Sequence, residues 1–265
     1  MTSGLVLVNG ASGKIGATLR SGLREAGWQL RLQDIEPLGE AADGEELVEG
    51  DMFDDVVLEA AVAGVESLVH LAAIPTEAPY AEIHRVNIEG TYRYFEAARR
   101  AGVRRIVFAG SNHAVGLTPR QELAPADLPP RPDTYYGVSK VFAEALGRLY
   151  VDRYGMEMVS LRIGSFLLRP LRPRHLATWL SPGDTVRLVD AALRAPDVTF
   201  VTVWGISANT RGWWDDGPGR ALGYEPQDDA EAYAAEVIAE HGSPDMDDVT
   251  EAFVGGEYAG PEFDF

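Results

Sequence analysis

The sequence predicts an α/β fold, in which helices cover both faces of a doubly wound parallel sheet and a small C-terminal lobe covers one end of it. Two observations carry this prediction. Short apolar runs rich in strand-forming residues alternate with longer amphipathic segments, and several of these segments end in glycine. Strand and helix in this order give a parallel sheet, because each helix returns the chain to the starting edge.

The strands are predicted from apolar, mostly β-branched or leucine-rich runs, and the helices from apolar residues that recur every three or four positions. The expected strands span residues 5–8, 30–32, 46–50, 67–71, 105–109, 158–162 and 199–203. The expected helices span residues 15–26, 54–63, 81–101, 136–154, 185–195 and 229–240. The glycines expected to end helices in a left-handed conformation are Gly27, Gly64, Gly102 and Gly155. Proline clusters at 125–132 and 170–173 predict loops.

Charge and composition exclude several classes of protein. The 41 acidic residues outnumber the 23 basic ones, and the net charge of −18 argues against nucleic acid and anionic membranes as partners. Without cysteine there are no disulfides and no thiolate metal sites. The first residues lack the features of a signal peptide, and no stretch reaches the ~18 apolar residues of a membrane span. We therefore expect a cytoplasmic protein.

Lysine is almost absent from the chain. Lys14 and Lys140 are the only two, and neither Lys nor Arg follows Arg220. An acidic surface with so few lysines suggests adaptation to high salt, where the repulsion between carboxylates is screened. Drift in composition is the alternative explanation. In either case the two lysines that remain are candidates for function.

A glycine-rich loop joins the first strand to the first helix. Gly10, Gly13 and Gly16 form a G-x-x-G-x-x-G variant of the dinucleotide fingerprint. Glycine lets the backbone approach a pyrophosphate, and the helix N-terminus, which includes Lys14 and Ile15, offers N–H donors and a positive dipole end. This places a Rossmann-type cofactor site at the loop. Lys14 would add charge there or simply be solvated.

Acidic residues follow the next two strands. Asp34 stands 18 residues after Gly16, where a carboxylate binds the adenosine ribose and repels a 2′-phosphate, so NAD is favoured over NADP. Asp51 and Met52 are expected to contact adenine. Capping of the next helix by Asp51 or Asp54 is the alternative for that position.

The fourth strand leads into small residues at which the chain would pass close to the cofactor, Leu71, Ala72 and Ala73. Asn87 would tie the loops on the cofactor side together or hold a water. The alternative, equally compatible with a single Asn on a helix, is that it is a polar residue facing solvent. We expect one domain over residues 1–265, with residues 1–160 mainly the NAD-binding core and residues 161–265 mainly the substrate-binding lobe.

The strongest chemical signal is the combination of Ser111 after the fifth strand with Tyr136 and Lys140 on one helix. Residues four apart share a helix face. An ammonium group near a phenol lowers the phenol pKa, as does an oxidised nicotinamide, which makes a phenolate base available near neutral pH. Ser111 would hold the reacting oxygen. The spacing of a metal-ligand set is absent, so no metal is expected.

These residues resemble the short-chain dehydrogenase/reductase superfamily in its extended, epimerase-like form. Narrower motifs are similar to those of the NAD-dependent uronate dehydrogenases, and the resemblance covers nearly the whole chain. The motifs are Gly110-Ser111-Asn112-His113, Tyr136-Gly137-Val138-Ser139-Lys140, Arg162-Ile163-Gly164-Ser165, Trp204-Gly205-Ile206-Ser207-Ala208-Asn209 and Gly212-Trp213-Trp214-Asp215. One departure is Asn9, where Thr usually precedes the first glycine, which puts a supporting hydrogen bond of the loop in doubt.

The resemblance implies oxidation of a hexuronate such as glucuronate or galacturonate at C1 to an aldarolactone, in a homo-oligomer as is common in this superfamily. A carboxylate needs positive charge, and arginines cluster after the sixth strand at Arg162, Arg169, Arg172 and Arg174. Arg174 matches the arginine of the family's loop. Ser165, Asn112 and His113 would bind sugar hydroxyls. Trp213 and Trp214 more simply pack the lobe.

Two other functions fit parts of this pattern. A sugar-nucleotide epimerase or dehydratase of the same superfamily would need room for a nucleoside diphosphate, and the 125 residues after Lys140 are few for such a lobe. A non-catalytic protein that senses NAD would keep the cofactor fold but would not need Ser111, Tyr136 and Lys140 together.

Overall fold

The computed structural model describes residues 4–260 and 263, and its centre is a seven-stranded parallel sheet. The strand order is β3-β2-β1-β4-β5-β6-β9. The strands are β1 (Leu5–Asn9), β2 (Gln29–Asp34), β3 (Glu45–Glu49), β4 (Ser67–His70), β5 (Arg105–Ser111), β6 (Glu157–Ile163) and β9 (Phe200–Gly205). All seven overlap the predicted strands, so the doubly wound α/β prediction is confirmed.

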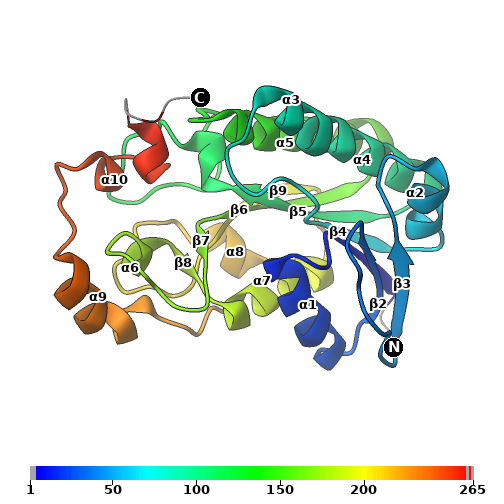
Figure 1. Cartoon of the computed structure of the whole chain (residues 1–265), viewed down its shortest axis with the longest axis horizontal. Coiled ribbons are helices and arrows are strands. Elements are labelled where there is room, and N and C mark those ends of the chain that lie inside the picture. Colours follow the sequence, from blue (N-terminus) through cyan, green and yellow to red (C-terminus); the bar gives the residue numbers. More distant parts are fainter. Residues whose placement is uncertain (1–3, 261–262, 264–265) are drawn as a thin grey trace.

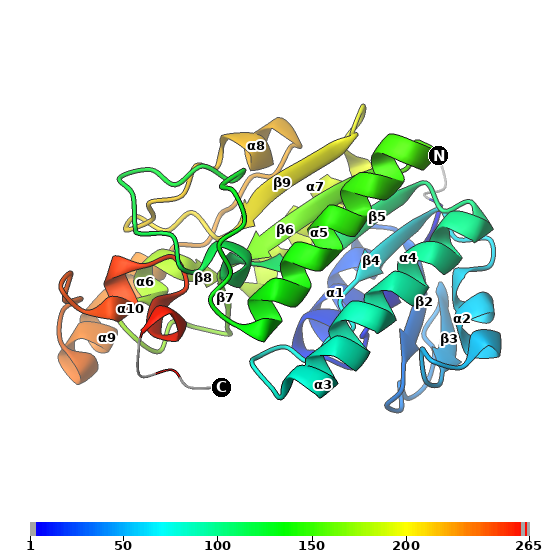
Figure 2. The same ribbon diagram turned by 90° about the horizontal axis from the view of Figure 1, so that it is seen from above.

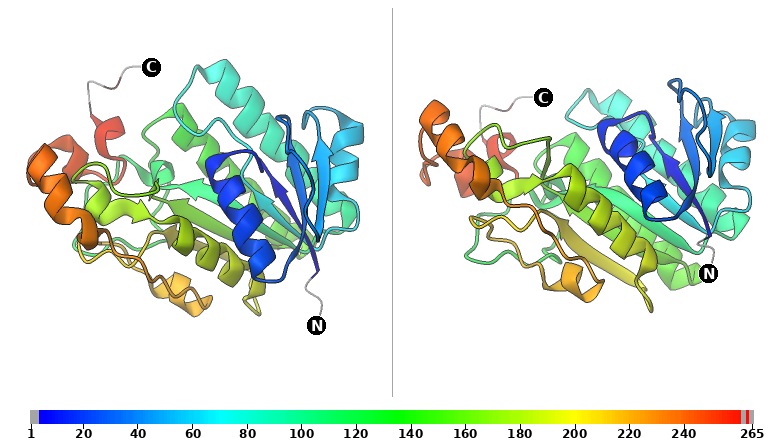
Figure 3. Two further views of the ribbon diagram at one scale, coloured as in Figure 1. Left: turned by 60° about the horizontal axis from the view of Figure 1, so that its bottom comes forward. Right: turned by 90° about the horizontal axis from the view of Figure 1, so that it is seen from below.

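Helices cover both faces of the sheet (Figure 1). The helices α1 (Lys14–Glu25) and α7 (Pro182–Arg194) lie side by side on one face (Figure 3), where Leu19, Leu23 and Leu188 join the core. The other face carries α2 (Asp55–Val62), α4 (Gly90–Ala101) and α5 (Tyr135–Tyr154). Because both faces are buried, the inner strands are apolar on both sides, which is why their sequences do not alternate.

The helix predicted over residues 81–101 is real but not uniform. It comprises α3 (Tyr80–Ile83), a π-helical segment η1 (His84–Glu89) and α4. A π-turn inserts an extra residue into the helix, and such turns often occur at functional sites. Here it contains Asn87, whose side chain is buried and faces the loop after β4. The four glycines predicted to end helices all have positive φ, between 68° and 90°.

The remaining chain lies beyond the carboxyl ends of the strands (Figure 2). It contains η2 (Asn112–Val115), β7 (Ser165–Phe166), α6 (His175–Thr178), β8 (Trp179–Leu180), α8 (Gly217–Ala221), η3 (Ala230–Tyr233), α9 (Ala234–His241), α10 (Val249–Ala252) and η4 (Gly256–Ala259). Trp213 and Trp214 are buried in this region, and their rings stack with centroids 3.6 Å apart. The pair therefore packs with Trp204 in a hydrophobic cluster that also contains Leu128 and Val254. No helix of the described residues is long and apolar enough to span a membrane.

One member of the arginine cluster is buried beneath the sheet edge. Arg162 on β6 forms a salt bridge with Glu144 of α5 at 2.8 Å, and both side chains are at least 90% buried. The Arg162 guanidinium also donates to the carbonyls of Ala126 and Leu128. It therefore anchors the loop before α5 and is not available to a ligand, contrary to its inclusion among the carboxylate-binding candidates.

The substitution Glu144→Gln should destabilise the protein, because it leaves the buried Arg162 without its counter-ion. We expect the free energy of unfolding to fall by about 3–5 kcal/mol, as measured by urea denaturation. The control is Asp152→Asn on the same helix, which breaks the exposed pair with Arg148 and should change stability little. Equal losses in the two variants would contradict the prediction.

Candidate active site

The glycine loop fits a dinucleotide pyrophosphate. Gly10 has φ +72°, and a Cβ there would lie 2.7 Å from the Ala72 nitrogen. A Cβ on Gly16 would overlap the backbone of the loop itself. The N-terminus of α1 has no side-chain cap and no acidic residue in its first turn. Its positive end is therefore open to an anion such as a pyrophosphate.

Asn9 supplies the support that the departure from the family pattern put in doubt. Its Oδ1 accepts hydrogen bonds from the Leu71 and Ala72 nitrogens at 2.9 and 3.4 Å. Its Nδ2 contacts Nδ1 of the buried His70 at 2.8 Å, and the His70 Nε2 contacts the Thr91 hydroxyl. Burial, together with the charge of Lys140, lowers the His70 pKa to about 3, so this imidazole is neutral. The loops after β1 and β4 are thus joined by one uncharged network.

Asp34 at the end of β2 organises the loop as well. Its carboxylate accepts hydrogen bonds from the backbone nitrogens of Ser12 at 2.9 Å and Glu36 at 3.1 Å. The next residue, Ile35, is apolar yet 64% exposed. The contact of Asp34 with ribose stays a prediction.

Asp51 and Met52 occupy the turn before α2. The Asp51 carboxylate accepts from the Phe53 nitrogen at 3.0 Å, and Asp54 is the residue that caps the helix, through the Val56 nitrogen. The Met52 side chain packs against Gly90, since a Cβ there would lie 2.5 Å from its sulfur. Their contact with adenine remains a prediction.

Asn87 holds the loop that continues from Leu71, Ala72 and Ala73. Its Oδ1 accepts from the Ile74 nitrogen at 2.8 Å and its Nδ2 donates to the Ile74 oxygen at 3.0 Å. Nδ2 also donates to the Ser139 hydroxyl, which itself donates to the Tyr136 carbonyl at 2.6 Å. The π-turn residue therefore ties the loop to the first turn of α5.

Ser111, Tyr136 and Lys140 meet at the carboxyl end of β5. Lys140 is buried, and its ammonium donates to the Ala109 carbonyl at 2.8 Å and lies 5.2 Å from the centre of the Tyr136 ring. Ser111 is buried and accepts a hydrogen bond from the His113 nitrogen. The sequence grouped these three residues from the helix spacing of Tyr136 and Lys140 and the position of Ser111 after a strand, and in the structure they lie close together.

The pKa of Tyr136 differs from the expectation. Burial raises it to about 12, and the hydrogen bond with Ser111 opposes this shift. Lys140 is not among the groups that shift it, although its ammonium, which donates to the Ala109 carbonyl, lies 5.2 Å from the ring centre. Burial lowers the pKa of Lys140 itself to about 8, while Glu144 opposes the shift. In the protein alone the phenol is therefore protonated, and the lowered pKa expected near neutrality is not found without bound cofactor.

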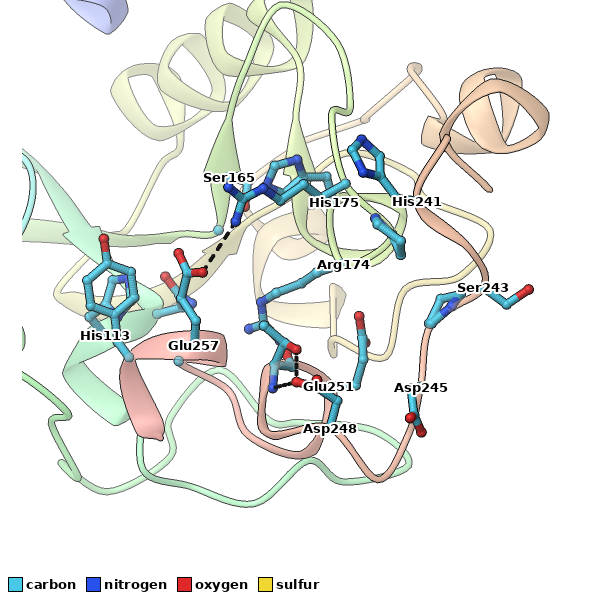
Figure 4. A pocket seen from close by; sticks show the side chains of 18 residues that line it. His113, Ser165, Arg174, His175, His241, Ser243, Asp245, Asp248, Glu251 and Glu257 are labelled. Atoms are coloured by element: carbon cyan, nitrogen blue, oxygen red, sulfur yellow. Dashed lines mark hydrogen bonds and ion pairs between the residues drawn. The ribbon is translucent and has the colours of Figure 1, made fainter. Parts of the chain in front are cut away.

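A cavity of about 410 Å³ lies beside η2, the segment that directly follows Ser111, and Figure 4 shows the side chains that line it. Four of the five predicted substrate-binding residues line it, namely Asn112, His113, Ser165 and Arg174, whereas Ser111 is not among the lining residues. Their contact with substrate stays a prediction. The Ser165 hydroxyl is 2.9 Å from that of Thr178. Arg172 also lines the cavity, but its side chain is exposed and pairs with Glu257. Arg169 is not among the lining residues and pairs with Glu236 at the surface.

Arg174 and Asn112 both hold the C-terminal segment that closes the cavity. The Arg174 guanidinium donates to the carbonyls of Thr250, Phe253 and Val254, and the Asn112 amide donates to the Val254 carbonyl at 2.9 Å. Burial lowers the Arg174 pKa to about 10, which leaves it charged near neutrality. The two side chains thus have structural partners in addition to any ligand.

Sequence reasoning missed three neighbours of the site. Glu77 accepts a hydrogen bond from the Tyr136 nitrogen at 2.8 Å, and its other oxygen is the one buried side-chain polar atom of the described residues that has no partner. Asp133 contacts His113. The ring of Tyr258 lies 4.7 Å from that of His113. The only sequence signal near them is the pair Asp133-Thr134 before α5, and these residue types predict a helix N-cap and not a contact with His113.

Comparison with known proteins gives a consistent result. A family model described as the NAD dependent epimerase/dehydratase family matches residues 6–182. The chain is 43% identical to a uronate dehydrogenase of Agrobacterium fabrum over 96% of each chain. It is 41% identical to one of Pseudomonas putida, over 96% of this chain and 95% of that protein.

Solved structures agree with these relatives. A crystal structure of uronate dehydrogenase from Agrobacterium tumefaciens superposes with a TM-score of 0.91, at 42% identity and 99% coverage of both chains. A mutant of that enzyme complexed with NAD gives a TM-score of 0.91 at 41% identity, over 98% of each chain.

The substitution Asp34→Asn should reduce the difference in affinity by which the protein prefers NADH to NADPH. The amide oxygen can still accept from the Ser12 nitrogen, but the charge that repels a 2′-phosphate is gone. We expect the Kd for NADH to rise about tenfold and the Kd for NADPH not to rise, as measured by fluorescence titration. Asp43→Asn, in the exposed loop before β3, is the control. A parallel rise for both dinucleotides would contradict a role in discrimination.

Proposed function

The chain belongs to the NAD-dependent epimerase/dehydratase family and, within it, to the uronate dehydrogenases, and on this premise we propose that it oxidises a hexuronate at C1 to an aldarolactone. NAD is its cofactor, and the uncapped N-terminus of α1 fits the pyrophosphate of that cofactor. The observation that carries the proposal is the joint placement of Ser111, Tyr136 and Lys140 at the carboxyl end of β5. The residues that directly follow Ser111, namely Asn112 and His113, line a cavity together with Arg174.

Tyr136 is the base in this proposal. Its phenolate takes the proton of the C1 hydroxyl while Ser111 donates a hydrogen bond that holds the reacting oxygen. Bound NAD accepts the hydride from C1 and adds the positive charge of its oxidised nicotinamide to the site. Burial, helped by Asp133 and Tyr258, raises the Tyr136 pKa to about 12 despite the hydrogen bond with Ser111, so nearby positive charges are needed to stabilise the phenolate. Lys140, fixed by the Ala109 carbonyl, supplies one of them and would bind the nicotinamide ribose.

Arg174 would orient the substrate carboxylate. Of its five N–H donors, three are used by the C-terminal carbonyls, through Nη1 twice and Nη2 once. The Nε–H and one Nη2–H remain, and these two can bind a carboxylate side-on with both oxygens. Asn112, His113 and Ser165 would bind the sugar hydroxyls from the same wall of the cavity.

Two further parts of the proposal concern the protein in the cell. A cytoplasmic location agrees with the absence of cysteine and with the supply of NAD there. A homo-oligomer would cover exposed aromatic and aliphatic side chains of α4 and α5, such as Tyr92, Leu149 and Tyr154.

The substitution Tyr136→Phe tests the proposed base. It removes the hydroxyl but keeps the ring, so kcat with glucuronate or galacturonate should fall about 10²–10⁴-fold, while the Kd for NADH stays within a factor of three. The assay is NADH formation from NAD, with NADP and neutral hexoses as controls, at low and high salt. Near-normal turnover by the variant would refute the role of Tyr136. Equal activity on hexoses would refute the uronate assignment.

The substitution Arg174→Lys tests carboxylate recognition. A lysine cannot form the side-on pair, so we expect the KM for uronates to rise about 10–100-fold. Arg169→Gln is the matched control, because Arg169 lies in the same loop, is exposed and paired with Glu236, and is not among the residues that line the cavity. The thermal midpoint of each variant shows whether the C-terminal segment is still held. If both variants keep the normal KM, Arg174 does not bind the carboxylate.

A further inference from the structure

A buried carboxylate lies directly behind His113. The side chain of Asp133 is fully buried, and its Oδ2 is 2.8 Å from Nδ1 of His113. Its Oδ1 accepts a hydrogen bond from the hydroxyl of Thr134 at 3.0 Å. The carboxylate belongs to the loop before α5, whereas His113 follows β5, so the contact joins two segments of the site.

The backbone around Asp133 leaves room for this carboxylate and for nothing larger. A Cβ on Gly116 or on Gly255 would overlap Oδ2, and a Cβ on Gly137 would lie 3.1 Å from Oδ1. These glycines come from three separate segments, namely the end of η2, the turn between α10 and η4, and the first turn of α5. The pocket is therefore shaped around the carboxyl group by all three.

The contact decides which ring nitrogen of His113 carries the proton. An ionised carboxylate only accepts hydrogen bonds, so Nδ1 must be protonated to bind it. In a neutral imidazole the other nitrogen, Nε2, is then an acceptor. It has no hydrogen bond to any residue that the structure describes, and His113 lines the cavity. The rings of Tyr136 and Tyr258 meet the imidazole edge to face, with centroids at 5.9 and 4.7 Å, and fix its plane.

We propose that Asp133 is a positioning residue that holds His113 with its Nδ1–H toward the carboxylate and so presents Nε2 to the cavity as an acceptor for a hydroxyl of the substrate. The second half of this proposal rests on the proposed function. The Asn112 amide and the rotatable Ser165 hydroxyl can each either donate or accept a hydrogen bond, so neither fixes the direction of a sugar hydroxyl. His113 then selects the orientation of one hydroxyl, because a sugar that directs no O–H at Nε2 leaves that acceptor unpaired.

The tautomer of His113 can be measured without any substrate. The chain has five histidines, so a protein labelled with ¹⁵N-histidine gives a simple nitrogen spectrum, and the signals of residue 113 are those lost in His113→Gln. We expect the wild-type protein near pH 8 to show a protonated Nδ1 and an unprotonated Nε2. In Asp133→Asn the amide can turn its NH₂ toward the ring, so the Nε2–H form should appear. A wild-type Nε2–H tautomer, or no change in the variant, would overturn the proposal.

The kinetics of Asp133→Asn test the consequence for binding. Asparagine matches the shape of aspartate and fits among the three glycines, so the thermal midpoint should show a folded protein. We expect the KM for the uronate to rise about tenfold, with kcat within threefold and an unchanged Kd for NADH. Asp127→Asn, an exposed residue of the same loop, is the control. A fall in kcat at normal KM would overturn the proposed role. Because the tautomer is read without substrate, a failure of the uronate assignment would leave that result intact.

Discussion

The parallel direction of all seven strands is the constraint on which the rest of the molecule depends. Parallel strands place their carboxyl ends on one edge of the sheet, and the loops that follow them meet there. The glycine loop after β1 contacts the small residues after β4, about sixty positions later in the sequence, and Ser111 follows β5, the next strand of the sheet. No single loop contains the site, so its geometry depends on the packing of the whole sheet.

Short polar bridges convert this common edge into a fixed arrangement. Asn9 binds the loop after β4, Asn87 binds the same loop to α5, and the Lys140 ammonium binds α5 to the β5 carbonyl of Ala109. Each bridge uses a side chain that is at least 90% buried. Buried polar groups with satisfied hydrogen bonds favour one arrangement strongly, because breaking any bond leaves a desolvated group unpaired.

The substrate side is arranged differently. There the C-terminal segment returns over the cavity, and Asn112 and Arg174 both donate to the carbonyl of Val254. The two side chains proposed to bind a sugar acid thus also fix the C-terminal segment that lines the cavity. Positive charge is scarce in a chain with a net charge of −18, and the carboxylates of Glu251, Asp133 and Glu257 near the buried Arg174 favour its charged form. Whether the acidic surface is an adaptation to salt stays a prediction.

The sequence by itself determined the doubly wound fold, the place of the glycine loop and the set formed by Ser111, Tyr136 and Lys140. Those features rest on local patterns, namely strand and helix periodicity, glycine spacing and two residues four apart on one helix. Only the tertiary structure decided that Arg162 is a buried structural partner of Glu144, that Asp133 stands behind His113 and that Tyr258 reaches the site. Each of these contacts joins residues from different elements, and their spacing in the chain contains no period or motif. These contacts form only when the sheet and the C-terminal segment have packed.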